Sequence, residues 1–134
     1  MTCPETALEA ALHRMRTTEF RRGTNDCGAI LADYVQVLTG RDPMSAWRGA
    51  YDDDESAEAV MSREGGVGAM TRQGMGSIGI EPAPGQAQRG DVVVIDYHGE
   101  EVLGLCTGSY CAFKTERGCR QSRFATILEV YRCV

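Results

Sequence analysis

The spacing of apolar residues changes along the chain, and this change most restricts the possible folds. From Cys27 to Leu38, apolar residues recur at the spacing of one face of an α-helix. From Val92 onward, they form short runs that are typical of buried strands. Helical patterns thus precede strand patterns and do not alternate with them. This order predicts an α+β fold and argues against a parallel α/β sheet.

The local signals predict the following elements. Thr2-Cys3-Pro4-Glu5 resembles a capping box for a first helix that ends near Thr17. The best-patterned helix begins after Thr24 or Asn25 and ends at Gly40. Short helices are expected over residues 43–47 and 52–61, and strands over 92–95, 102–106, 110–114 and 127–134, forming an antiparallel meander. Residues 65–79 contain six glycines, which predicts a flexible or turned segment with a helical turn around Met70.

Length and charge narrow the function classes. The 134 residues, 43% of them hydrophobic, suit one domain spanning 1–134. No apolar run approaches the roughly 20 residues of a membrane span, so we expect no membrane partner. The net charge of −5 and the lack of a basic stripe argue against a nucleic-acid partner. Residues 1–9 carry two acids and no base, unlike a signal peptide, so we expect a protein that is cytoplasmic as synthesised.

Six cysteines offer two further interpretations, either structural thiols or a metal site. Without an export signal they are expected to stay reduced. Their spacing matches no zinc pattern and includes no Cys-x-x-Cys pair, so we predict no metal and no cofactor. A metal-binding module built from the C-terminal cysteines remains an alternative function. The cysteines are Cys3, Cys27, Cys106, Cys111, Cys119 and Cys133.

Cys27 is the cysteine with a chemical reason to be reactive. It falls in the first turn of the best-patterned helix, where free N–H groups and the helix dipole favour an anion and lower a thiol pKa. Gly28 would let a substrate backbone come close. Asp26 acts in the opposite direction if its carboxylate faces the sulfur. The alternative is that Cys27 only begins the apolar stripe of the helix.

Three segments resemble the NlpC-type cell-wall peptidases, which are papain-like cysteine hydrolases of peptidoglycan stem peptides. They are residues 20–27, which end in Asp-Cys, residues 90–95 (Gly-Asp-Val-Val-Val-Ile) and residues 102–108 (Val-Leu-Gly-Leu-Cys-Thr-Gly). The resemblance is greatest to a small subgroup encoded among the tail genes of phages and prophages. It implies a papain-like fold, Cys27 as nucleophile, and peptidoglycan stem peptides or phage tail proteins as partners. A tail component would be located in the virion.

The two histidines, His13 and His98, do not fall where this family keeps its catalytic base. The residue of this chain at the base position is Val102, which cannot accept a proton. His98, in an expected hairpin turn, is the candidate substitute base, and His13 is expected on a helix surface. Two functions follow from the resemblance. One is a peptidoglycan peptide hydrolase that uses Cys27 and His98, and the other is a catalytically inactive, papain-like assembly component of a tail.

Overall fold

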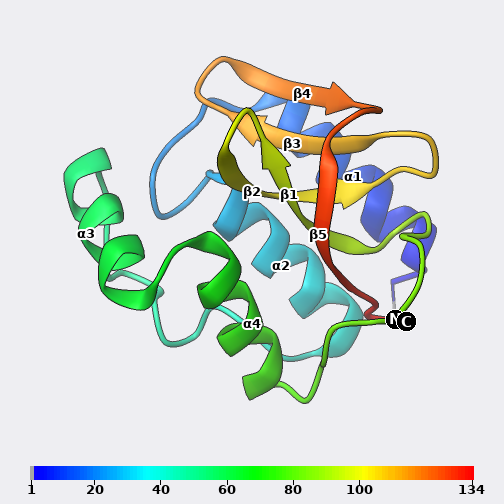
Figure 1. Ribbon diagram of the computed structural model, residues 1–134, viewed down its shortest axis with the longest axis horizontal. Helices are drawn as coiled ribbons and strands as arrows, with labels where there is room; N and C mark the ends of the chain where they lie inside the picture. The colour runs from blue at the N-terminus through cyan, green and yellow to red at the C-terminus, as the bar shows by residue number, and fades with distance from the viewer. Residues whose placement is uncertain (1) are drawn as a thin grey trace.

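The computed structural model describes residues 2–134, which contain four helices followed by five strands (Figure 1). The α+β class and the order of helices before strands are therefore confirmed. None of the described helices is both long and apolar enough to cross a membrane. The elements are α1 (Pro4–Thr17), α2 (Cys27–Thr39), α3 (Asp54–Glu64), α4 (Val67–Ser77), β1 (Val92–Tyr97), β2 (Glu100–Cys106), β3 (Cys111–Thr115), β4 (Gly118–Ser122) and β5 (Thr126–Tyr131).

The first two helices follow the predicted patterns, but their caps differ from the predicted ones. Pro4 opens α1, yet its N-cap Cys3 makes no side-chain capping bond, so the expected capping box is wrong. The N-cap of α2 is Asp26, and neither Thr24 nor Asn25 takes that role. Gly40 ends α2 in the left-handed conformation at φ 74°, as predicted.

The middle of the chain departs from the predicted elements in two places. The expected short helix over residues 43–47 is a series of turns. The glycine-rich segment was expected to be flexible or turned, with a helical turn around Met70; that turn is present, but it is part of the 11-residue helix α4. Gly74 permits its packing, because a Cβ there would lie 2.3 Å from the Pro43 carbonyl oxygen and 3.2 Å from the Trp47 ring. Gly74 thus reflects close helix packing, whereas a Cβ on Gly76 would meet nothing within 4 Å.

The five strands form one antiparallel sheet in the order β4-β3-β2-β1-β5. The β1–β2 hairpin turns at His98 and Gly99, with Tyr97 paired to Glu100, as predicted. Strand β4 was not expected. The last strand then pairs with β1 at the opposite edge from β4, so the predicted simple meander holds only for β1 to β4.

The two faces of the sheet have different surroundings. Helices α1, α2 and α4 pack against one face, where Leu103 and Leu105 of β2 join the main core (Figure 1). On the other face Val102 and Cys106 of β2 belong to a smaller apolar cluster with Phe113. Alternate residues of β2 therefore point to two separate environments, as strand geometry requires.

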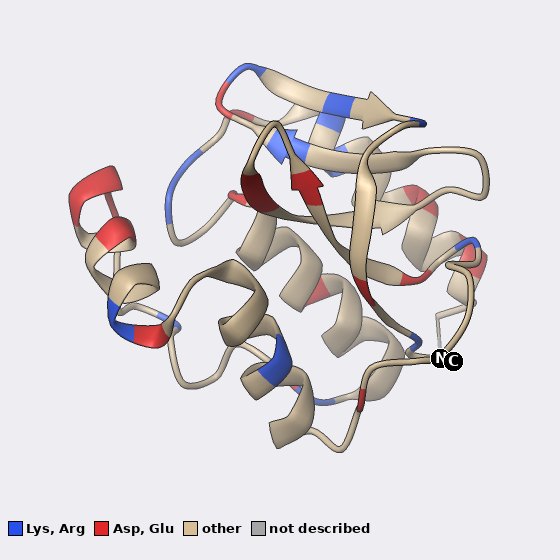
Figure 2. Ribbon diagram, viewed as in Figure 1, with Lys and Arg blue, Asp and Glu red and all other residues tan. Residues whose placement is uncertain are grey.

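Helix α3 lies at one end of the molecule, beyond α2 and α4 (Figure 1). Its first turn carries Asp54 and Glu55, and Figure 2 shows this acidic start projecting from the body. Asp53 caps the helix and forms a reciprocal capping box with Ser56. The acidic run thus lies at the positive end of the helix dipole, where negative charge is stabilised, as predicted.

Candidate functional site

Cys27 is the first residue of α2 and follows a tight turn. In this turn Asn25 donates its backbone N–H to the Arg21 carbonyl at 2.8 Å, and Gly23 adopts φ 88°. A Cβ on Gly23 would lie 2.4 Å from the Tyr51 carbonyl oxygen, so the turn has room only for glycine. The turn therefore fixes Cys27 at the helix N-terminus, where the sequence placed it.

Asp26 is buried and accepts three hydrogen bonds. Its Oδ1 accepts from the backbone N–H of Ala29 at 2.8 Å, and its Oδ2 accepts from the N–H of Gly23 at 2.9 Å. The Tyr51 hydroxyl donates to Oδ2 at 2.9 Å. This carboxylate therefore caps α2 and ties the segment around Tyr51 to the helix start.

A cavity of about 110 Å³ lies beside Cys27, among α2, α3, α4 and β2. Its walls are mainly apolar, although Arg22 and Asp26 also line it. The volume is somewhat smaller than the roughly 150 Å³ cavity that can hold one benzene molecule. The apolar and sulfur-containing side chains of the walls include Leu31, Val35, Met44, Trp47, Met61, Met70, Met75 and Leu103.

The expected lowering of the Cys27 pKa is wrong. Burial, reinforced by the Asp26 carboxylate, raises the pKa of the Cys27 thiol to about 11. Backbone hydrogen bonds from Leu103 and Gly28, together with the Arg22 guanidinium, act in the opposite direction but are weaker. The helix N-terminus favours a thiolate, but the apolar surroundings and an adjacent carboxylate outweigh it. Cys27 is therefore a protonated thiol at neutral pH.

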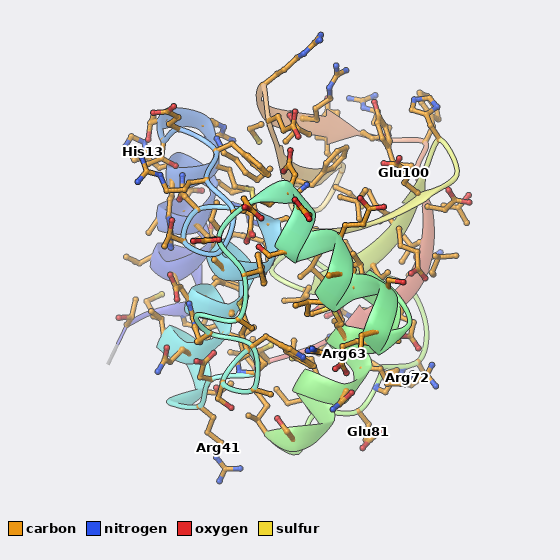
Figure 3. The ribbon with its side chains drawn as sticks, turned by 90° about the vertical axis from the view of Figure 1, so that its left-hand side faces the viewer. His13, Arg41, Arg63, Arg72, Glu81 and Glu100 are labelled. Carbon is orange, nitrogen blue, oxygen red and sulfur yellow. The ribbon has the colours of Figure 1, made fainter. Side chains whose placement is uncertain are left out.

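The structure does not bring either histidine to Cys27. His98 is exposed in the β1–β2 turn, where its ring contacts Tyr97 at a centroid distance of 4.3 Å. The turn that contains His98 leads into Glu100, the first residue of β2. Three strand residues, about 10 Å, then separate Glu100 from Leu103, which lies beside Cys27. Figure 3 shows Glu100 on one side of the molecule and His13, exposed on α1, on the other.

Val102, at the position where the NlpC-type resemblance implies a base, lies on the face of β2 away from Cys27. Val102 packs into the apolar cluster on the far side of the sheet, whereas Leu103 lines the Cys27 cavity. The resemblance also implies an orienting polar residue on the following strand, which here is β3, but residues 111–114 include no histidine, asparagine or glutamine. Lys114 of β3 is buried and donates to the Met15 carbonyl at 2.9 Å and to that of Thr18, which stabilises the end of α1.

The remaining cysteines do not assemble a metal centre. All six thiols are free. Among residues 2–134, no three histidine, cysteine, aspartate or glutamate side chains gather closely enough to hold a metal ion. The arrangement of the described residues therefore gives no support to the metal-binding alternative.

Sequence reasoning found Cys27, which lines the cavity. It missed the role of Asp26, although an aspartate directly before a helical stripe is a recognisable N-cap signal. It also missed the methionines of the cavity wall, which carry no local sequence signal.

Comparison with known proteins places the chain in a family. Neither the comparison with curated proteins nor that with solved structures gave a match. A family model does match residues 3–133, almost the whole chain. The chain therefore belongs to the family described as a domain of unknown function, DUF6950.

Proposed function

We propose that this protein is a non-catalytic binding module with a papain-like, NlpC-type architecture, and that it serves as an assembly component of a phage or prophage tail. The observation that carries the proposal is the state of Cys27. Its thiol is protonated, with a pKa of about 11, and no imidazole lies beside it in the described chain. A papain-like hydrolase needs a thiolate and a base within hydrogen-bond reach.

The architecture supports the resemblance on which the proposal depends. Cys27 begins a helix that packs against an antiparallel sheet, and the N-terminus of this helix contacts β2 at Leu103. This is the relation between nucleophile helix and base-bearing strand that the NlpC-type resemblance implies. Here, the cavity residue on that strand is an apolar leucine, which suits binding rather than proton transfer.

The cavity supplies the proposed binding chemistry. Its wall combines Trp47 with four methionines, whose flexible thioether side chains adapt to apolar groups of different shapes. We expect it to accept an apolar side chain from a tail protein, with Cys27 acting as a small, neutral wall residue. A partner side chain of leucine or phenylalanine size matches the volume to within the adjustment that methionines permit.

A peptidoglycan peptide hydrolase is the second candidate, and one observation favours it. Cys27 lines a cavity at a helix N-terminus, where backbone N–H groups could stabilise an oxyanion. This candidate requires His98 to reach Cys27, which means that the β1–β2 hairpin must fold back over the cavity.

Two assays distinguish the candidates. Purified protein is incubated with peptidoglycan of several stem-peptide types, and released peptides are quantified by chromatography and mass spectrometry. The binding module predicts no release above that of Cys27→Ala, whereas release that is lost in both Cys27→Ala and His98→Ala would establish the hydrolase.

The binding assay tests the module directly. The protein is mixed with purified tail proteins, and complexes are separated by size-exclusion chromatography. Met61→Trp, which puts a larger side chain into the cavity wall, should weaken a complex at least about tenfold, because the tryptophan takes the space of the inserted group. Cys27→Ser should leave it within about threefold. Equal binding by the wild type and Met61→Trp would contradict the proposed use of the cavity.

A further inference from the structure

A second pocket lies on the other face of the sheet and contains two cysteines. It has a volume of about 560 Å³ and lies between the connection before β1 and the turns of β2–β3 and β4–β5. Cys106, at the end of β2, and Cys111, at the start of β3, both line it. Both side chains belong to the apolar cluster on the face away from Cys27. This pair is thus separate from the site described above.

Cys106 and Cys111 lie directly opposite each other in the β2–β3 pairing. The N–H of Cys106 donates to the Asp91 carbonyl at 2.9 Å, and its carbonyl accepts from the N–H of Gly90 at 2.8 Å. Both backbone groups of Cys106 therefore point toward the β1 side, so Cys106 and Cys111 form a non-hydrogen-bonded pair.

This kind of pair brings the two thiols within bonding range. Opposed residues of a non-hydrogen-bonded pair have Cα atoms about 4.5 Å apart, with their side chains on the same face. A disulfide requires Cα atoms roughly 4.4–6.8 Å apart, so no strand has to move out of register for the bond to form. The turn between the strands is held by the Thr107 N–H, which donates to the Tyr110 carbonyl at 2.8 Å.

We propose that Cys106 and Cys111 form a reversible modification site, which closes to an intramolecular disulfide when a small-molecule disulfide of the glutathione class enters the second pocket. Cys106 and Cys111 are both buried, but they form part of the wall of an open pocket. This pocket gives a small oxidant access to the two thiols. Larger protein disulfides are excluded because the thiols lie below the surface.

The chemistry is an ordinary pair of thiol–disulfide exchanges. One cysteine, as its thiolate, attacks a sulfur of oxidised glutathione, forms a mixed disulfide and releases one glutathione thiolate. The second cysteine loses its proton, attacks the protein-bound sulfur and expels the second glutathione thiolate. The protein loses two electrons and two protons, and oxidised glutathione becomes two molecules of glutathione. Reduced glutathione in excess reverses both steps.

Tryptic digestion gives a direct readout, because cleavage after Arg89 and Lys114 yields one peptide, residues 90–114, that contains these two cysteines and no other. The folded wild-type protein is equilibrated with glutathione mixtures of rising oxidised fraction, quenched with acid and alkylated. We expect the peptide to become two hydrogens lighter and resistant to alkylation. Half-conversion should need at least about tenfold less oxidised glutathione than half-glutathionylation of Cys119.

The controls separate a structural pair from general thiol reactivity. Cys119→Ser should leave the conversion of peptide 90–114 unchanged, and Cys111→Ser should abolish it. In urea the equilibrium constant for the bond should fall at least about fivefold, because unfolding removes the strand pairing. A peptide 90–114 that stays a dithiol or carries glutathione in the folded protein would overturn the proposal, as would an equal equilibrium constant in urea.

Discussion

Replacing Asp26 with alanine should destabilise the protein strongly, because one buried carboxylate accepts bonds from three parts of the chain. The substitution removes the N-cap of α2, which costs about 1–2 kcal/mol. It also leaves the Gly23 N–H and the Tyr51 hydroxyl without their acceptor, at about 1 kcal/mol or more each. We therefore expect the free energy of unfolding to fall by about 3–5 kcal/mol.

Urea denaturation followed by circular dichroism measures this change, with the slope of the transition confirming that the same surface unfolds. Asp26→Asn keeps one oxygen acceptor and should cost less, about 1–2 kcal/mol. Tyr51→Phe removes only the hydroxyl, and its cost should shrink in the Asp26→Ala background, because the partner is already gone. A loss below about 0.5 kcal/mol in Asp26→Ala, or strictly additive costs in the double variant, would refute this role of the carboxylate.

Two further predictions concern the packing that positions the site. Lys114→Met should lower the free energy of unfolding by about 2–4 kcal/mol in urea denaturation, because the carbonyls of Met15 and Thr18 lose their donor. A change within about 0.5 kcal/mol would contradict this role of Lys114. Gly74→Ala should lower the thermal midpoint, because its Cβ would meet the neighbouring turn. Gly76→Ala in the same helix places its Cβ where nothing lies within 4 Å, so it should raise the free energy of unfolding by about 0.5–1 kcal/mol. Equal shifts for the two alanine variants would show that helix propensity, and not packing, decides.

Strong local signals explain which parts of the fold were predictable. Helix α2 carries a clear apolar stripe and a terminal glycine, and the β1–β2 hairpin carries an apolar run followed by a turn. Only one turn of helix α4, around Met70, was expected, because the glycines of this segment lower helix propensity. The stability of the full helix comes instead from contact with the rest of the protein. Strand β4 (Gly118–Ser122) was missed because it is a short, polar edge strand.

In the candidate site, too, the features set by neighbouring residues were predictable, and those set by distant segments were not. The position of Cys27 at a helix start follows from its neighbours in sequence, so it was predictable. Its pKa was not, because burial by α3, α4 and β2 decides the direction, and these segments are distant in the chain. The side of β2 that faces Cys27 depends on strand register, which places Leu103 rather than Val102 in the cavity.

The pH dependence of Cys27 alkylation tests the central claim most directly. Cleavage after Arg22 and Arg41 isolates Cys27 in its own peptide, and the exposed Cys3 provides an internal reference. Backbone N–H groups of Thr6 and Glu5 lower the pKa of the Cys3 thiol, so Cys3 is a fast-reacting reference. With a pKa of about 11 against the ordinary 9.0, Cys27 should react with iodoacetamide about 100-fold more slowly than an unperturbed thiol at pH 7. Its rate should then rise about tenfold per pH unit up to pH 10. Labelling faster than that of Cys3 at pH 7, with a plateau below about pH 8, would contradict the non-catalytic account and indicate an activated nucleophile.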